Sequence, residues 1–302
     1  MQNWKELSLT ENGFYGYFKE GTKYPEKAMI CMSGSDGNKE FALGIGQEIR
    51  DMGYSVLVLG FYKWEGLPQE KCLVPVEYAE YAVKWLLAWE GGKIKKVGIM
   101  GASMGAQYAL LCASLLPNLS CVIAAAPFDY VLEYVDDKFR RTGKSVYTWR
   151  EKEVTYSPSV LLDKGVPGLL WKCATDKHYG LKRMLRFYYD NSTFEEASRI
   201  RVENMKADVL LLASENDDCW PAEISARHVE KILKENNYVH RVKTVIYEKG
   251  SHAIGGVSIM QNKKVRKMMK AMLPAEKKYP KECEEARKDS VKQIADFLEQ
   301  WN

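Results

Sequence analysis

The stretch Lys96–Ala109 reads KVGIMGASMGAQYA and predicts a strand, a sharp turn and a helix in direct succession. The apolar run at its start is typical of a short buried strand, and the Ala-rich run at its end is typical of a helix. Ser103 stands at the turn, with Gly101 two residues before it and Gly105 two residues after it. The stretch therefore places a serine hydroxyl at the carboxyl end of a strand.

This GxSxG pattern has three interpretations. At a strained strand-to-helix turn the backbone comes close to its neighbours, so glycines on both sides leave room while the serine hydroxyl points to solvent as a nucleophile. The pattern could also be a plain glycine-rich turn, or Gly98, Gly101 and Gly105 could form a dinucleotide-binding turn. The spacing is not GxGxxG, and no isolated acidic residue ends the following strand, so we favour a nucleophilic Ser103.

Short apolar runs alternate with longer segments of helical period along the chain. The expected strands are Ala28–Met32, Ser55–Gly60, Val97–Met100, Cys121–Ala125, Val209–Ala213 and Val242–Tyr247. The expected helices lie near Lys39–Met52, from Pro75 to Glu90, from Ser103 to about Leu116, from Pro221 onward and over Ser290–Trp301. This order predicts an α/β fold with a mostly parallel central sheet flanked by helices, and with the GxSxG turn it indicates the α/β-hydrolase fold.

The pattern breaks down between residues 127 and 206. This region is aromatic and charged, and it shows no strand alternation. We expect it to be a cap insertion over the sheet, within a single domain that spans residues 1–302.

An acidic loop follows the expected strand Val209–Ala213, at the edge of the sheet where sites of open α/β sheets lie. A serine nucleophile needs a base and an orienting acid, which in this fold follow it in the order serine, acid, histidine. Asp217, four residues before Pro221, is our candidate acid. Its neighbour Asp218 is the alternative, and a turn that merely caps the next helix is the structural explanation.

Four histidines are available as the base. His252 directly follows the expected strand Val242–Tyr247, whose carboxyl end should adjoin the acidic loop. His228 falls within a helix, His240 precedes a strand and His178 lies in the expected cap. We therefore predict that His252 is the base.

The negative oxygen formed by attack on a carbonyl needs two backbone N–H donors. One should come from Met104, the residue after the nucleophile. The second should come from the loop after Met32, with Ser35 as the first candidate and Asp36 as the second. A simple tight turn is the alternative explanation of this loop.

Composition narrows the class of protein. The 302 residues are 46% hydrophobic and 28% charged, with a formal net charge of +4, which is too small to indicate a nucleic-acid partner. The seven cysteines are scattered and form no CxxC pair, so we interpret them as reduced core residues and expect no metal and no cofactor. We also expect no leader, no membrane span and a cytoplasmic location.

The chain resembles the acyl-CoA thioesterase and bile acid-CoA:amino acid N-acyltransferase family, in its C-terminal catalytic domain. The resemblance is carried by Ala28–Gly37, Lys96–Ala126, Arg199–Pro221, the loop Tyr247–His252 and the tail Tyr279–Trp301. It implies hydrolysis of acyl-CoA thioesters or transfer of the acyl group to an amino acid. The amidating relatives use cysteine where this chain has Ser103, which favours water as the acceptor. We also expect the β-sandwich of larger members to be absent ahead of Ser103.

Together these observations predict a serine hydrolase that cleaves carboxylic esters or thioesters, with acyl-CoA as the first candidate substrate. The alternatives are an esterase similar to dienelactone hydrolase, a peptidase, or a catalytically silent binding protein of the same fold. The basic residues Lys263, Lys264, Arg266, Lys267 and Lys270 either hold CoA phosphates or form a solvated helix face. The expected partner is a small molecule, and the sequence leaves the oligomeric state open.

Overall fold

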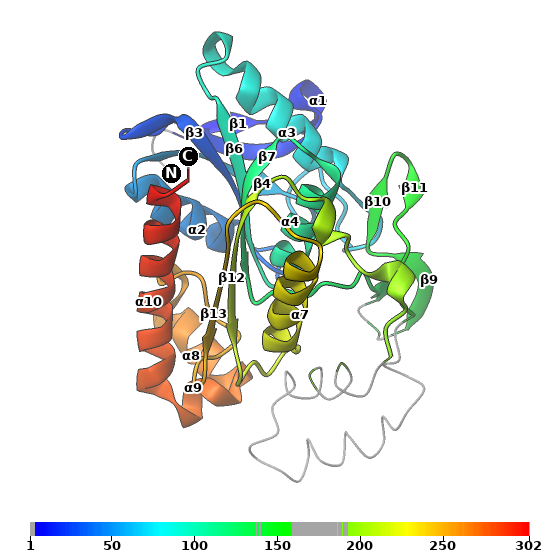
Figure 1. Cartoon of the computed structure of the whole chain (residues 1–302), viewed down its shortest axis with the longest axis vertical. Helices are drawn as coiled ribbons and strands as arrows, with labels where there is room; N and C mark the ends of the chain where they lie inside the picture. Colours follow the sequence, from blue (N-terminus) through cyan, green and yellow to red (C-terminus); the bar gives the residue numbers. More distant parts are fainter. Residues whose placement is uncertain are drawn as a thin grey trace.

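The computed structural model describes residues 4–136, 138, 140–158, 186, 189, 193–261 and 263–301, with only the backbone of Ile259 and Lys264 (Figure 1). Its main sheet is built from β1 (Lys5–Leu7), β2 (Tyr15–Lys19), β3 (Tyr24–Met32), β4 (Tyr54–Gly60), β6 (Lys96–Ala102), β7 (Leu119–Ala125), β12 (Asp208–Ser214) and β13 (Val242–Tyr247). The strand order is β1-β2-β4-β3-β6-β7-β12-β13. All neighbours from β4 to β13 are parallel, whereas β1 and β2 are antiparallel.

Helices cover both faces of this sheet (Figure 1). One face carries α2 (Lys39–Asp51) and α10 (Pro280–Glu299), and the other carries α3 (Glu77–Ala88), α4 (Met104–Leu115) and α7 (Ala222–Glu235). The shorter helices are α1 (Leu9–Asn12), α8 (Lys263–Met272), α9 (Pro274–Lys278) and the 3₁₀ segments η1 (Trp89–Gly91), η2 (Glu196–Ser198), η3 (Val202–Asn204) and η4 (Ser258–Gln261). The expected α/β-hydrolase architecture is confirmed.

Burial explains why the central strands are apolar along their whole length. Every residue of β4 is buried, and β12 is buried from Val209 to Ser214. Parallel strands between two helical layers have no solvent face, so they need continuous apolar runs rather than alternation. Helix α4 has buried residues on all sides, which explains its composition of small and apolar residues.

The expected strands are all present, with their ends shifted by a few residues, and the differences have local causes. The helix expected from Pro75 begins at Glu77, because Pro75 belongs to β5 (Val74–Pro75), which pairs with β10 (Tyr147–Trp149). The last helix begins at Pro280 rather than Ser290. The strands β1 and β2 and the helix α9 were not among the sequence expectations, whereas a helix over the basic residues of α8 was one of the two interpretations of that stretch.

The segment 127–206 departs from the expectation that it lacks strands. It contains β8 (Glu133–Val135), β9 (Arg141–Ser145), β10 and β11 (Lys152–Glu153), which are too short to produce a recognisable alternation. Within the segment, Arg186 donates to the main-chain oxygen of Asp217 at 3.2 Å, and Tyr189 packs edge-on against Trp220. These contacts place part of the segment against the acidic loop, and a cap over the sheet stays a prediction.

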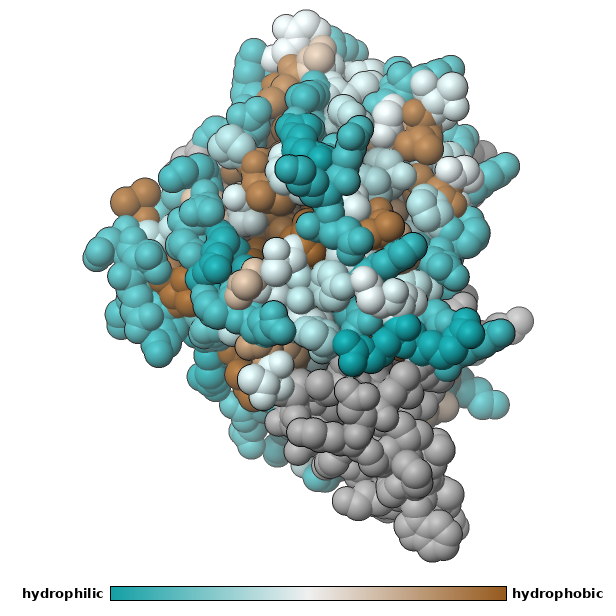
Figure 2. Space-filling model, turned by 90° about the vertical axis from the view of Figure 1, so that its right-hand side faces the viewer, coloured by the Kyte–Doolittle hydropathy of each residue, from teal (hydrophilic) through white to brown (hydrophobic). Residues whose placement is uncertain are grey.

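None of the helices that the structure describes is long and apolar enough to cross a membrane. On the face shown in Figure 2, hydrophilic residues cover most of the described surface, and apolar residues form small separate groups.

Candidate active site

Ser103 occupies the turn between β6 and α4. Its φ of +57° and ψ of −124° are unusual for a residue with a side chain. The turn is fixed by the Ser103 N–H, which donates to the main-chain oxygen of Ala125 at 2.8 Å, at the end of the neighbouring strand β7. The surrounding structure thus holds a strained backbone that presents the serine side chain at the carboxyl edge of the sheet.

The two glycines of the GxSxG pattern are required by close backbone contacts. A Cβ atom on Gly101 would lie well under 3.0 Å from the main-chain oxygen of Gly105. A Cβ atom on Gly105 would lie equally close to the main-chain oxygen of Ser33. No rotation of a side chain could relieve these contacts, because both partners are backbone atoms. The glycines therefore let β6, α4 and the loop after β3 converge around Ser103.

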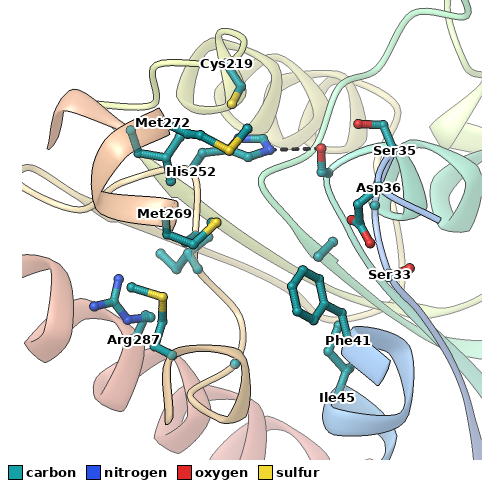
Figure 3. Close-up of a pocket in the computed structure, with 18 of the residues that line it drawn as sticks. Ser33, Ser35, Asp36, Phe41, Ile45, Cys219, His252, Met269, Met272 and Arg287 are labelled. Carbon is teal, nitrogen blue, oxygen red and sulfur yellow. Dashed lines mark hydrogen bonds between the residues drawn. The ribbon is translucent and has the colours of Figure 1, made fainter. Parts of the chain in front are cut away.

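Three side chains from three loops meet at this edge, and Figure 3 shows the hydrogen bond that His252 makes there. The His252 Nε2 atom lies 2.9 Å from the Ser103 Oγ atom, and the His252 Nδ1 atom lies 2.7 Å from the Asp217 Oδ2 atom. The side chain of Asp217 has no exposed surface, and that of His252 is 13% exposed. The structure thus brings together the serine, acid and histidine predicted from the sequence, in hydrogen-bonding contact.

The geometry distinguishes Asp217 from its neighbour Asp218. The Oδ1 atom of Asp217 accepts the N–H groups of Cys219 at 2.8 Å and Trp220 at 3.2 Å, which leaves Oδ2 for the histidine. The Oδ2 atom of Asp218 instead accepts the N–H of Ala275, in α9, at 2.9 Å. Asp217 therefore faces the histidine, while Asp218 connects the acidic loop to α9.

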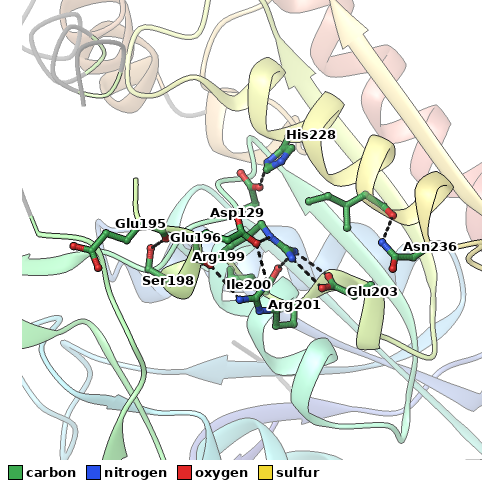
Figure 4. Close-up of polar contacts among 11 residues, drawn as sticks. Asp129, Glu195, Glu196, Ser198, Arg199, Ile200, Arg201, Glu203, His228 and Asn236 are labelled. Atoms are coloured by element: carbon green, nitrogen blue, oxygen red, sulfur yellow. Dashed lines mark hydrogen bonds and ion pairs between the residues drawn. The ribbon is translucent and has the colours of Figure 1, made fainter. Parts of the chain in front are cut away.

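The remaining histidines have other surroundings. The His228 Nδ1 atom, on α7, lies 2.7 Å from the Asp129 Oδ2 atom (Figure 4). The other carboxylate oxygen of Asp129 accepts the Ser225 hydroxyl. Nearby, Arg199 forms a two-pronged ion pair with Glu203, with both N–O distances at 2.9 Å (Figure 4). His240 packs against Tyr238, and His178 lies outside the described residues. Neither His228 nor His240 contacts Ser103.

The charge state of His252 depends on the groups around it. Burial lowers its pKa, but the Asp217 carboxylate and the neighbouring Cys219 outweigh this effect and raise the pKa of His252 above its ordinary 6.5. The same carboxylate stabilises the imidazolium that forms when His252 accepts a proton. Cys219 was not singled out from the sequence, although its position two residues after Asp217 was visible.

The loop after β3 passes close to Ser103. A Cβ atom on Gly34 would lie 2.9 Å from the Ser103 Cβ atom, and Ser33, Gly34, Ser35 and Asp36 all line the same pocket as Ser103. The main-chain oxygen of Ser35 accepts the Tyr62 hydroxyl, which fixes the orientation of this turn. Met104 begins α4, where the first N–H groups have no acceptor within the helix. Both predicted oxyanion donors, Met104 and Ser35, are thus close to Ser103, and their role stays a prediction.

A cavity of about 280 Å³ opens beside Ser103 and His252. Its walls are mainly apolar and include Phe41 and Ile45 from α2 and Met268, Met269 and Met272 from α8 (Figure 3). Methionine side chains are flexible and adapt to ligands of varied shape. The sequence analysis missed this wall, although the run Met268–Met272 (MMKAM) in an otherwise basic segment was a visible signal.

A buried ion pair lies at the edge of this cavity. Arg287, which lines the cavity, donates to Glu276 of α9, and the same Glu276 oxygen accepts the Ser251 hydroxyl. Ser251 directly precedes His252, so α9 contacts the histidine loop through Glu276 and the acidic loop through the Asp218–Ala275 bond. Helix α9 thereby fixes the two loops that carry Asp217 and His252 relative to each other.

One set of residues near the site has the chemistry of metal ligands. Asp217, Cys219 and His252 each offer a potential ligand atom, all within 4.8 Å of one another. The hydrogen bonds between Asp217 and His252, and from the Cys219 N–H to Asp217, account for this grouping.

Comparison with known sequences identifies relatives of the chain. Residues 74–256 match the family model described as BAAT / acyl-CoA thioester hydrolase C terminal. The peroxisomal succinyl-coenzyme A thioesterase of Mus musculus is 27% identical over 176 residues, which are 57% of this chain and 36% of that protein. Acyl-coenzyme A thioesterase 1 of Homo sapiens is 26% identical over 205 residues, which are 67% of this chain and 43% of that protein. The chain thus spans less than half the length of these curated relatives.

Comparison with solved structures supports the same fold. The esterase Pf2001 of Pyrococcus furiosus superposes with a TM-score of 0.54 at 16% identity, over 99% of this chain and 93% of that one. A putative dienelactone hydrolase from Klebsiella pneumoniae gives a TM-score of 0.52 at 13% identity, over 99% and 98% of the two chains. The sequence match decides the family. The family model matches residues 74–256, more than half of this chain, so the chain belongs to the BAAT / acyl-CoA thioester hydrolase C-terminal family.

Proposed function

We propose that the protein is a serine hydrolase that cleaves carboxylic thioesters or esters through an acyl-enzyme, with an acyl-CoA as its substrate. The observation that carries this proposal is the continuous hydrogen-bonded series Ser103–His252–Asp217 at the mouth of an apolar cavity. A nucleophile, a base and an orienting acid in this arrangement are the requirements for acyl transfer through a serine.

The first half of the reaction forms the acyl-enzyme. The Ser103 Oγ atom attacks the carbonyl carbon of the substrate while its proton passes to the His252 Nε2 atom. Asp217 holds His252 in the tautomer that carries its proton on Nδ1, and it stabilises the resulting imidazolium. Collapse of the tetrahedral intermediate expels the thiolate or alkoxide, which takes the proton from His252.

The second half releases the acid. Water attacks the acyl group on Ser103 and gives a proton to His252, and the Ser103 oxygen recovers this proton as it leaves. In both halves, the N–H groups of Met104 and Ser35 donate to the negative oxygen of the intermediate. The position of Gly34 against the Ser103 side chain supports this assignment, because it brings the loop beside the attacking hydroxyl.

The substrate class rests on the cavity and on the relatives. At roughly 30 Å³ for each water-sized group, a volume of about 280 Å³ holds on the order of nine non-hydrogen atoms, which suits an apolar acyl chain. The printed names of the curated relatives are acyl-CoA thioesterases. Water is the acceptor, because the chain has serine at the nucleophile position.

Turnover of acyl thioesters tests this proposal. We expect the protein to release free thiol from an acyl-CoA in a thiol-reagent assay, and we expect Ser103→Ala to reduce the rate to the background of the buffer. Ser114→Ala is the matched control, because among the described residues the Ser114 hydroxyl bonds within α4, to the main-chain oxygen of Leu111, and it lies outside the cavity lining. Equal turnover by wild type and Ser103→Ala would reject the proposal.

Two alternatives predict different results in the same assay. A silent binding protein of the same fold would show no turnover, and a plain esterase or a peptidase would prefer an oxygen ester or an amide over the matching thioester.

A cytoplasmic location stays a prediction, because the names of the relatives include a peroxisomal and a mitochondrial enzyme.

A further inference from the structure

Helix α8 has two different faces. Met268, Met269 and Met272 stand at positions i, i+1 and i+4, so they share one face, and all three line the cavity that contains Ser103. Lys263, Lys267 and Lys270 stand at positions i, i+4 and i+7 and share the opposite face, where all three are exposed. A single helix therefore forms one wall of the cavity and carries a row of cations outside it.

None of these cations forms a close ion pair among the described residues, and only Arg266 is near enough to a described carboxylate, that of Glu284 in α10, to help lower its pKa. The side chains of Lys263, Arg266, Lys267 and Lys270 form no ion pair with another described residue. The Lys264 side chain lies outside the described part of the structure. Some helix cations elsewhere on the surface are paired within their own helix, as Lys288 is with Glu284 and Lys231 with Glu235. The row on α8 is thus available to an external anion.

The surrounding sequence strengthens this positive charge. Residues 263–278 include seven lysines and arginines and one acidic residue, Glu276. Glu276 is buried and paired with Arg287, so it does not offset the exposed cations. Like charges this close together repel one another, and they create a positive potential that attracts anions.

The position of α8 relative to Ser103 indicates which partner this is. Met268 is 45% exposed and also lines the cavity, so it marks where the cavity meets solvent along α8. Asp36 lies across the cavity from α8 (Figure 3), so an anion leaving the cavity is repelled on that side and attracted on the other. A substrate with an apolar acyl end and a phosphorylated leaving group would place its two ends on the two faces of this helix.

We propose that Lys263, Lys267 and Lys270, with Arg266 beside them, bind the phosphate groups of the leaving group while the methionine face of the same helix contacts the acyl chain. The flexible pantetheine arm of an acyl-CoA lets its nucleotide phosphates reach around α8 to cations that do not point into the cavity. This inference rests on the proposed hydrolysis of acyl-CoA, and it adds the residues that select CoA over a simple thiol. It makes α8 the element that determines specificity for the leaving group.

The test compares substrates that differ only in the phosphorylated part. Lys267→Gln/Lys270→Gln removes two cations and keeps helix propensity, and Lys231→Gln/Lys234→Gln on α7 is the matched control. For an acyl-CoA, we expect the α8 variant to raise KM by about three- to thirtyfold at low salt, since each exposed charge pair contributes a few-fold. For the matching acyl-pantetheine thioester, which lacks the nucleotide, we expect no change. The control variant should match wild type on both substrates.

Salt provides a second readout. The difference between acyl-CoA and acyl-pantetheine should shrink at high ionic strength in wild type and be nearly absent at any ionic strength in the α8 variant. Equal KM increases for both substrates, or no increase for acyl-CoA, would overturn the proposal.

Direct binding separates this site from the catalytic proposal. Calorimetric titration with adenosine 3′,5′-bisphosphate should show binding to wild type and to the α7 control, and much weaker binding to the α8 variant. If the wild-type protein binds the bisphosphate and the α8 variant does not, but neither hydrolyses a thioester, the proposed hydrolysis is rejected and the phosphate site is kept.

Binding to vesicles that contain an anionic phospholipid is the last test. Wild-type binding to vesicles that depends on Lys267 and Lys270, without any effect of the variant on bisphosphate binding, would assign these cations to a lipid surface and refute the proposal.

Discussion

The replacement of Asp217 by asparagine isolates the contribution of one carboxylate oxygen. Asparagine has the same shape as aspartate. In the wild-type protein the N–H groups of Cys219 and Trp220 donate to the Asp217 Oδ1 atom, and the asparagine side-chain oxygen can still accept them. The NH₂ group then takes the place of Oδ2, 2.7 Å from the His252 Nδ1 atom. Because an NH₂ group only donates, His252 must turn its Nδ1 lone pair toward it and carry its proton on Nε2. A protonated Nε2 cannot accept the proton of Ser103.

The expected loss follows from this change of tautomer. We expect kcat to fall by about three to four orders of magnitude, which corresponds to about 4–5.5 kcal/mol of transition-state stabilisation. KM should change little, because Asp217 has no exposed surface and does not line the cavity. Cooperative thermal unfolding should be retained, since the backbone donors of the acidic loop keep their acceptor.

Asp218→Asn is the matched control. Its side-chain oxygen can still accept the N–H of Ala275, so we expect kcat within a few-fold of wild type. The assay is the release of thiol from an acyl-CoA at saturating concentration, with circular dichroism to verify folding. A small effect in Asp217→Asn together with a large one in Asp218→Asn would refute the assignment of the acid.

Two further predictions concern pH and the tight turn at the nucleophile. The acidic limb of the pH profile of kcat/KM should lie above pH 6.5, because Asp217 and Cys219 raise the pKa of His252 and only the neutral imidazole acts as a base. Cys219→Ala should move this limb to lower pH, and an unmoved limb would show that Cys219 does not act on His252. Gly105→Ala should lower the free energy of unfolding by about 1–3 kcal/mol or more, because its Cβ atom would collide with the Ser33 main-chain oxygen. Urea denaturation that gives the wild-type value would contradict the need for glycine there.

The central fold could be predicted because its signals are local. The buried strands between two helical layers require continuous apolar runs, and the turn at Ser103 requires Gly101 and Gly105. The position of His252 followed from its place after the last strand. These features depend on elements that the parallel topology places side by side, so the order along the chain sufficed.

Other features depend on contacts that the sequence order does not reveal. The spacing from Pro221 favoured Asp217 but left Asp218 as an alternative, because the choice depends on which side chain the turn at Ser214–Trp220 directs toward His252. The strands of the segment 127–206 are two to five residues long, so they produce no periodic signal. The methionine wall forms only because α8 and α2 line the same cavity, and no local pattern predicts that arrangement.

Labelling with a fluorophosphonate probe tests the role of Ser103 most directly, because the probe forms a bond only with a serine that a base has activated. We expect intact mass spectrometry to show a single adduct on the folded wild-type protein, and peptide mapping to place it on Ser103. Ser103→Ala should remain unlabelled, and His252→Ala should label far more slowly than wild type. A folded wild-type protein that stays unlabelled, or that carries the adduct on another residue, would contradict the assignment of Ser103 as the nucleophile.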